Sequence, residues 1–267
     1  MKLGIYFYAL GTIAAGVFDL IWREFEPAHQ PIQAWGNVPG ERISAYVAGV
    51  WLIVAGAAFL LRSTARTAAA ACAVIYSVFA VFWFPRFVTA PHLLGQHISI
   101  YLGILGGVAQ QAILVAPALI VYTSSANRTS PLPDTATIIA RWTFGLSSLN
   151  FAIDHFNAVH MVAALVPAWM PLGGNFWAVL TGIAFLFAGI AILAGVLDVL
   201  AARLLGLMLL VFSVMALAPR VFVSPHNHIA WGSNAYNLAA VGAAWIFSEW
   251  LANHANRTRT LQQPSAA

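Results

Sequence analysis

Two short segments of the sequence repeat one spacing of proline, arginine and histidine, and they contain the residues best suited to chemistry. Residues 85–92 read Pro-Arg-Phe-Val-Thr-Ala-Pro-His, and residues 219–226, 134 positions later, read Pro-Arg-Val-Phe-Val-Ser-Pro-His. His92 and His226 hold the same place in the two segments. Near a pseudo-two-fold axis, two neutral imidazoles could ligate one metal ion or a haem iron, or bind one ligand. The alternative is that the prolines simply make a stiff corner between two helices.

Other polar residues lie beside these histidines. Arg86 and Arg220 align in the two segments and are candidate catalytic groups, or else contacts to lipid headgroups. His97 and His228 do not align with each other, but they are further candidate cofactor ligands. Seven of the eight histidines fall at or near the predicted external ends of membrane helices. We therefore expect the external face to carry the chemistry.

Two aspartates form a second candidate pair. Asp19 and Asp154 lie near the outer ends of the first and fifth apolar stretches, one residue away from the 134-residue offset. A charged side chain near the bilayer is costly and usually pairs or faces a cavity. We expect Asp19 to pair with Arg86, and Asp154 with Arg220. These pairs could be structural, or the carboxylates could move protons or cations while the arginines adjust their pKa.

Two tryptophans are also repeated. Trp35 and Trp169 follow an alanine at the same place in the two long external loops. Tryptophan commonly anchors helices at the level of the lipid headgroups. Alternatively, the two indole rings could cover a flat ligand such as a quinone ring.

The composition places these residues in a membrane protein. The chain is 61% hydrophobic and 7% charged, whereas soluble domains carry about 25% charged residues. A membrane helix needs roughly 20 apolar residues, and eight stretches qualify. They are Leu3–Trp22, Ile43–Leu61, Ala68–Phe84, Gln96–Tyr122, Ala140–Phe156, Phe176–Leu197, Ala202–Leu217 and Trp231–Leu251. Nothing in the charge pattern points to nucleic acid.

The eight stretches fall into two copies of four. The 134-residue offset also pairs Gly11 with Gly145 and Gly40 with Gly174, so the repeat spans nearly half of the chain. The sequence predicts an all-α polytopic membrane protein with two parallel four-helix repeats. Its parts are a first repeat (1–122), a linker (123–137), a second repeat (138–254) and a polar cytoplasmic tail (255–267).

Basic residues set the predicted orientation, because they favour the cytoplasmic side of short loops. With the amino terminus inside, eight fall on that side and four on the other. The eight are Lys2, Arg62, Arg66, Arg128, Arg141, Arg203, Arg257 and Arg259, and the four are Arg23, Arg42, Arg86 and Arg220. We expect a multi-pass protein of the bacterial inner membrane with both termini in the cytoplasm. An even number of spans per repeat makes the repeats parallel, about an axis along the membrane normal.

The fourth and eighth stretches are more polar than the rest, and we expect them to line any internal cavity. Their polar residues are Gln96, His97, Ser99, Gln110, Gln111, Ser233, Asn234, Tyr236 and Asn237. The single cysteine, Cys72, lies in an alanine-rich stretch and reads as a small buried hydrophobe. Disulfide chemistry and thiolate iron–sulfur ligation are therefore excluded, and a redox role would need a bound cofactor.

The layout of each half resembles a known family. Each has four spans, a long first external loop, a second span rich in small residues (Gly49–Leu60 and Ile183–Leu193) and a polar fourth span. This resembles the DoxX-like group of bacterial membrane proteins, here in tandem. The resemblance implies a membrane subunit of a quinone-linked or sulfur-linked redox system.

Three functions remain open at this stage. The first is a quinone-interacting or cofactor-binding redox subunit that uses His92, His226, Arg86 and Arg220, with quinone or haem as the ligand and a membrane or peripheral redox subunit as the partner. The second is a small-solute or ion transporter with Asp19 and Asp154 as coupling carboxylates. The third is a structural or assembly subunit of a membrane complex.

Overall fold

The computed structural model describes residues 2–30, 40–124 and 133–262, and it contains no strand in these ranges. The first part of the chain forms α1 (Lys2–Trp22), α2 (Glu41–Phe59), α3 (Ala65–Trp83), α4 (Arg86–Leu94) and α5 (Ile98–Ser124). The second forms α6 (Pro133–Asn157), α7 (Val159–Ala163), α8 (Gly173–Ala194), α9 (Asp198–Val211), the π-helix η2 (Phe212–Leu217), α10 (Ala218–Val223) and α11 (His228–Gln262). The predicted all-α class is confirmed.

Six segments of the described chain are long and apolar enough to cross a membrane, as expected for a multi-pass membrane protein. They are Leu3–Trp22, Glu41–Phe59, Ala65–Leu94, Ile98–Ser124, Gly173–Ala194 and Asp198–Val223. The other two predicted stretches are helical, within α6 and α11, but they are less apolar. Arg141, Asn150 and Asp154 lower the hydropathy of α6, and Asn234 and Asn237 lower that of α11.

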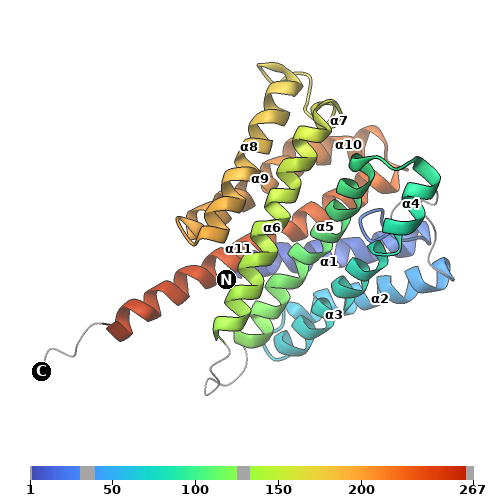
Figure 1. Cartoon of the computed structure of the whole chain (residues 1–267). Coiled ribbons are helices and arrows are strands. Elements are labelled where there is room, and N and C mark those ends of the chain that lie inside the picture. Colours follow the sequence, from blue (N-terminus) through green and yellow to red (C-terminus); the bar gives the residue numbers. More distant parts are fainter. Residues whose placement is uncertain (1, 31–39, 125–132, 263–267) are drawn as a thin grey trace, which may run out of the picture.

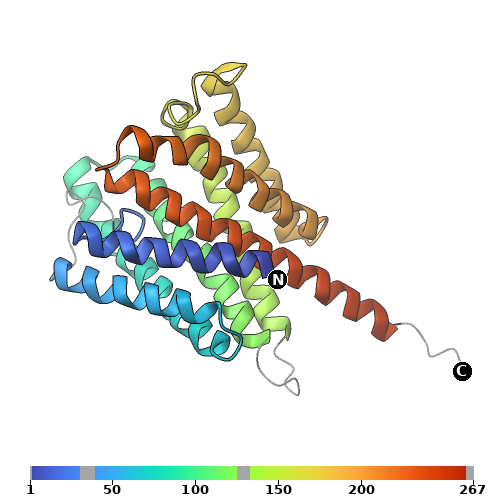
Figure 2. The ribbon, with the colours of Figure 1, turned by 180° about the vertical axis from the view of Figure 1, so that it is seen from behind.

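Helices from the two parts of the chain interleave. α1 packs along α2 and α11, and α6 packs along α8 and α5 (Figures 1 and 2). α3 packs on α5, α9 packs on α11, and α5 also touches α11. The carboxyl-terminal end of α11 extends beyond the bundle (Figure 1). The first helix is therefore held between its sequence neighbour and the last helix.

The contact between α1 and α11 is unusually close because small residues face each other. A Cβ added to Gly242 of α11 would lie 2.1 Å from the backbone nitrogen of Tyr8. A Cβ added to Gly11 of α1 would lie 2.4 Å from the backbone nitrogen of Ala239. Glycine and alanine allow two helix backbones to approach in this way, which is a common packing device in membranes.

Buried polar groups add hydrogen bonds inside the first part of the bundle. The Tyr8 hydroxyl donates to the carbonyl of Leu114 at 2.8 Å, and the hydroxyls of Thr12 and Tyr76 lie 2.9 Å apart. Cys72 is fully buried nearby, as its sequence context predicts. These bonds link α1 to α3 and α5.

Candidate functional site

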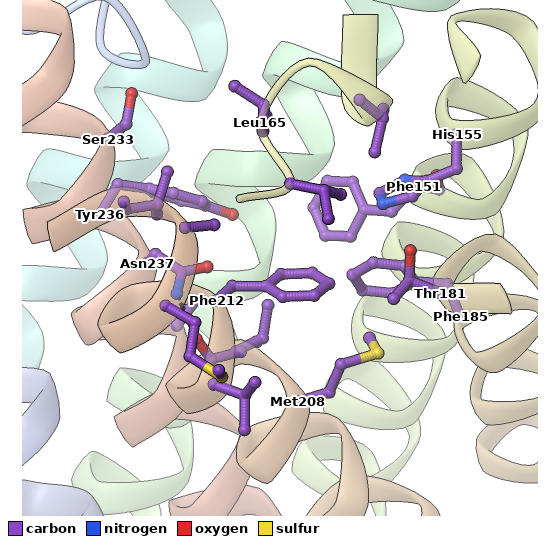
Figure 3. Close-up of a pocket in the computed structure, with 18 of the residues that line it drawn as sticks. Phe151, His155, Leu165, Thr181, Phe185, Met208, Phe212, Ser233, Tyr236 and Asn237 are labelled. Carbon is purple, nitrogen blue, oxygen red and sulfur yellow. Dashed lines mark hydrogen bonds between the residues drawn. The ribbon is translucent and has the colours of Figure 1, made fainter. Parts of the chain in front are cut away.

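A cavity of about 740 Å³ lies among the helices of the second part of the chain. Its walls come from α6, α8, α9, η2 and α11, and residues between 162 and 170 line another side (Figure 3). Trp83 of α3, Gln110 of α5 and the turn residues 26–28 complete the lining. This volume is sufficient for a drug-sized ligand or a cofactor ring.

The middle of the cavity is aromatic. The rings of Phe151 and Phe185 have centroids 5.5 Å apart, and those of Phe185 and Phe212 are 6.4 Å apart. The three rings lie between a polar side with His155 and Thr181 and another with Tyr236 and Asn237 (Figure 3). A flat apolar ring with polar groups at both ends would match this arrangement.

His155 has a defined hydrogen-bonding role at its end of the cavity. Its Nδ1 lies 2.8 Å from the carbonyl oxygen of Phe151. A carbonyl can only accept, so Nδ1 carries the proton in this bond and neutral His155 keeps Nε2 as an acceptor. The ring of His155 also contacts Phe185, with centroids 5.0 Å apart. This end of the cavity therefore offers an acceptor to a hydroxyl-bearing ligand.

The π-helix η2 shapes the side of the cavity nearest α11. Asn237 of α11 donates through Nδ2 to the carbonyl of Leu209 at 2.5 Å and to the hydroxyl of Ser213 at 2.8 Å. These bonds tie α11 to the segment where the helix widens, and Phe212 and Met215 of that segment line the cavity. Short π-helical insertions are frequent at functional sites.

The turn after α1 reaches the cavity because buried side chains hold its backbone. Asp19 Oδ1 accepts a bond from the backbone N–H of Glu26 at 2.7 Å. Trp83 Nε1 and Gln111 Nε2 both donate to the carbonyl of Ala28, at 3.0 and 2.6 Å. Glu26 itself is 1% exposed and lines the cavity. A segment that reads as an external loop is thus folded into the protein.

Asp19 and His29 form a buried pair beside this turn, which is an ion pair when the imidazole is protonated. Asp19 Oδ2 lies 3.4 Å from His29 Nδ1, and both side chains are almost completely buried. The imidazole stacks on Phe79 with a centroid distance of 4.0 Å. The predicted pairing of Asp19 with Arg86 is wrong, because the turn folds back and places His29 against the carboxylate instead.

The environment of the turn shifts two pKa values. Burial raises the pKa of Glu26 from its ordinary 4.5 to about 7, and the charge of Asp19 adds to this while His29 opposes it. Burial alone would lower the pKa of His29, but Asp19, with help from Glu26, raises it overall. Both groups therefore hold protons more tightly than they would in water.

These shifts predict that the protein loses stability as pH rises. Between pH 4.5 and about 7, folded Glu26 keeps a proton that the unfolded chain has released, so the free energy of unfolding falls with pH. The expected fall from Glu26 is about 3 kcal/mol. His29, whose folded pKa is raised, stabilises the fold at low pH and loses this contribution as pH rises. The measurement is thermal unfolding in detergent at a series of pH values.

The matched variants for this test are Glu26→Gln and Glu41→Gln. Glu26→Gln should flatten most of the decline, whereas Glu41→Gln, at the first turn of α2 and outside the cavity lining, should follow the wild type. Identical pH profiles for Glu26→Gln and the wild type would contradict the assignment.

The other predicted ionisable residues lie apart from the cavity. Arg86 is buried, with its guanidinium 5.8 Å from the ring centre of Trp83. Arg220 is exposed on α10. Asp154 is half-buried and accepts a bond from Asn150 at 3.1 Å, on the side of α6 that faces Gly106. The predicted pair of Asp154 and Arg220 is therefore wrong, because the carboxylate points into the bundle and the guanidinium lies on the surface.

The predicted histidine ligands do not converge. His92, His97 and His226 are exposed, and in the described part of the chain no hydrogen bond or ring contact joins His92 to His226. His228 is buried, pairs with Glu24 at 3.2 Å and stacks on Trp22 with centroids 4.8 Å apart. Within the described ranges, no group of three or more histidine, cysteine, aspartate or glutamate residues could hold a metal ion. The residues present thus do not fit a metal or haem site at His92 and His226.

The repeated tryptophans do not frame the cavity in the described structure. Trp169 is 67% exposed, and Trp35 lies outside the described residues. Of the residues predicted to line a cavity from the polar helices, four do so, namely Gln110, Ser233, Tyr236 and Asn237, and five do not, namely Gln96, His97, Ser99, Gln111 and Asn234. Sequence reasoning missed Glu26 and His155 as cavity residues, and also the three phenylalanines. Only His155 gave a signal, as a histidine one residue after a candidate aspartate.

Comparison with known proteins adds no relative: no protein-family model, curated protein or solved structure matches this chain. The function must therefore be argued from the cavity itself.

Proposed function

We propose that this protein binds a lipophilic ring compound of the quinone class in its cavity and presents it to a membrane redox system. The observation that carries the proposal is the cavity of about 740 Å³, with an aromatic middle and polar groups at both ends. A quinone has a flat ring with a carbonyl oxygen on either side and an isoprenoid chain soluble in lipid. The three phenylalanines suit the ring, and the hydroxyl of Tyr236 can donate to a quinone oxygen at one end. At the other end, Nε2 of His155 can accept a hydrogen bond from the hydroxyl of the reduced form, the quinol.

The opening of the cavity supports a ligand that arrives from the bilayer. Leu204, Leu207 and Val211 of α9 line the cavity, and they are also 53%, 50% and 42% exposed on the surface. The opening therefore lies along α9, at the depth of the hydrocarbon core in the proposed topology. A lipophilic molecule could enter there without passing through water.

In the first half of the chain, a tryptophan bridges two helices at the equivalent place. Trp51 of α2 donates through Nε1 to the carbonyl of Ala71 of α3 at 3.0 Å, which bridges the two helices. The 134-residue offset places Phe185 of α8 in the position of Trp51. Phenylalanine has no N–H to make such a bridge, and its ring lines the cavity instead. The groove of about 700 Å³ between α2 and α3 is lined mainly by valine and alanine, so it has none of the phenylalanines that form the middle of the cavity.

We also propose the complete topology of eight spans in two four-helix repeats. The packing partners support it, because α1 with α2 matches α6 with α8, α3 with α5 matches α9 with α11, and α1 with α11 matches α6 with α5. In α11, most side chains from Ala235 to Leu251 are buried, so protein rather than lipid surrounds this part of the helix. Polar residues are therefore tolerated there.

In this topology both termini are cytoplasmic, the membrane is the bacterial inner membrane, and the turn at Glu26 lies on the external side. The layout shared with the DoxX-like group is consistent with a redox subunit. The chain would bind and orient the quinone, while a partner subunit exchanges electrons with it.

The test is binding of a decyl-substituted benzoquinone to the purified protein in lipid nanodiscs. Ala216 of η2 lines the cavity, so Ala216→Phe should fill it and weaken binding at least tenfold. Ala184→Phe adds the same ring to an exposed position of α8 and should bind like the wild type. Equal quinone binding by both variants would contradict the proposal, and so would a wild-type protein that binds no quinone.

A second candidate function, transport coupled to a proton or cation, is favoured by one observation. Asp19 is completely buried and paired with His29, which is the setting of a carboxylate that changes protonation during a cycle. Reconstituted vesicles that show solute flux abolished by Asp19→Asn, with no quinone binding, would favour this function. Absence of both activities would favour the assembly role.

A further inference from the structure

Glu26 is held in a fixed place at the cavity wall. Its backbone N–H donates to Asp19, and the neighbouring carbonyl of Ala28 accepts bonds from Trp83 and Gln111. Three helices, α1, α3 and α5, therefore contribute side chains that clamp this one turn. Such convergence of buried polar groups fixes a side chain to a small range of positions.

The carboxyl group of Glu26 is also held in place by its contacts, as its backbone is. Oε2 accepts a bond from the backbone N–H of Ala28 at 2.9 Å. The rest of the carboxyl lies against Gly232 of α11, where an added Cβ would be 2.1 Å from Cγ and 2.6 Å from Oε1. Any other residue at position 232 would displace Glu26. The absence of a side chain there makes room for the carboxyl beside Ser233 and Tyr236, which also line the cavity.

The ionisable groups around Glu26 leave it without a cation of its own. Asp19 on α1, His29 in the same turn, Tyr76 on α3 and Tyr236 on α11 are its electrostatic neighbours. His29 has its ion pair with Asp19, and in the described part of the chain Glu26 makes no ion pair. Burial without a cation favours the neutral acid, and the pKa of Glu26 is raised to about 7. A neutral carboxyl has one O–H to donate.

We infer that Glu26 donates a hydrogen bond into the cavity and that it selects ligands with a carbonyl oxygen at this end. The inference rests on the proposed function, and it names what the site recognises. His155 offers a hydrogen-bond acceptor at the opposite side of the cavity. The Glu26 end therefore suits a carbonyl oxygen of the ligand, and the His155 end suits a hydroxyl group. A quinone carbonyl satisfies the Glu26 end, and a hydrocarbon ring of the same size does not.

The experiment compares two probes, decyl-benzoquinone and decylbenzene, in nanodiscs. They share the ring and the chain and differ in the carbonyl oxygens. Glu26→Leu should weaken quinone binding about tenfold and leave decylbenzene binding unchanged, because only the hydrogen bond is lost. Glu26→Gln should retain quinone binding, because its amide N–H also donates. Glu41→Gln serves as the control outside the cavity.

The pH dependence of binding supplies a second measurement. Above pH 7 the carboxylate form of Glu26 has no proton to donate, so wild-type affinity for the quinone should fall, while Glu26→Gln should show no such fall. This comparison applies even if Glu26→Leu does not fold, because glutamine keeps the size and polarity of the side chain.

The outcomes separate this inference from the proposed function. A wild-type protein that binds neither probe overturns the cavity as a quinone site, and the inference falls with it. A wild-type protein that binds both probes equally, with Glu26→Leu and Glu26→Gln behaving alike at every pH, overturns the role of Glu26 alone. Equal weakening of both probes by Glu26→Leu, with no pH effect in the wild type, would show a packing role instead.

Discussion

Replacing Gly242 by leucine should separate α1 from α11 and lower the free energy of unfolding by about 3 kcal/mol. A Cβ at this position would lie 2.1 Å from the backbone nitrogen of Tyr8 and 2.5 Å from the carbonyl oxygen of Gly4. Both are backbone atoms of α1, so no side-chain rotation can relieve the clash. The helix must move as a unit, and it carries the buried hydrogen bond of Tyr8 to α5. Thermal unfolding in detergent, followed by intrinsic fluorescence, measures the loss.

Ala184→Leu is the matched control for this substitution. Ala184 is exposed near the middle of α8, so leucine there adds apolar surface without a clash. Its unfolding temperature should stay close to that of the wild type. Gly242→Ala should give an intermediate loss, because it adds only the first atom. A Gly242→Leu protein as stable as Ala184→Leu would mean that α1 and α11 do not pack at this distance.

The positions of the helices could be predicted from sequence because hydropathy is a local property. The predicted first span Leu3–Trp22 corresponds to α1, and the predicted third, Ala68–Phe84, overlaps α3. The repeated Pro-Arg segments form short helices, α4 and α10, after the longer helices. The short helices agree with the predicted stiff turn between two membrane helices, and less well with the predicted ligand site at His92 and His226.

The candidate site could not be predicted in the same way, because its character depends on tertiary packing. Sequence reasoning favours ionisable residues, and it chose His92 and His226, which are exposed. The cavity wall is made mostly of apolar side chains, with phenylalanine, leucine and methionine prominent among them. Such residues have the same pattern in a membrane helix whether they face lipid or a ligand. Glu26 follows Arg23 and Glu24 and therefore reads as part of a solvated loop. Only the fold shows that the next residues turn inward.

The two halves of the chain differ in the position of the connection that follows their first long helix. In the first half, Phe25, His29 and Gln30 are buried among the helices, where they fill space. In the second half, the equivalent connection contributes Leu165 and Pro167 to the cavity lining. These three side chains of the first connection are thus packed among the helices, whereas the second connection forms one wall of the cavity. The 134-residue offset predicts two repeats, but it does not show where the cavity lies.

Asp19→Leu should be the most destabilising change at the inward turn, with a loss of about 3 to 5 kcal/mol. The substitution removes the partner of His29 and leaves the buried N–H of Glu26 without its acceptor. An unpaired buried group costs more than the original bond contributed. Asp154→Leu is the comparison, since Asp154 is only half-buried and its side-chain oxygen has one bond, from Asn150. Its loss should be about 1 kcal/mol, measured by the same unfolding assay.

A double variant tests whether the loss comes from the broken pair. His29 stacks on Phe79 at 4.0 Å, so His29→Phe can keep the ring contact without the charge. When both members of a buried pair become apolar, no unpaired imidazole remains, and most of the loss from Asp19→Leu should be recovered. The remaining loss in the free energy of unfolding comes from the backbone N–H of Glu26, which still lacks its acceptor. A coupling energy of about 2 kcal/mol between the two changes is expected. Simple additivity would mean that Asp19 acts only through the turn backbone, and the ion pair would then have no energetic role in the fold.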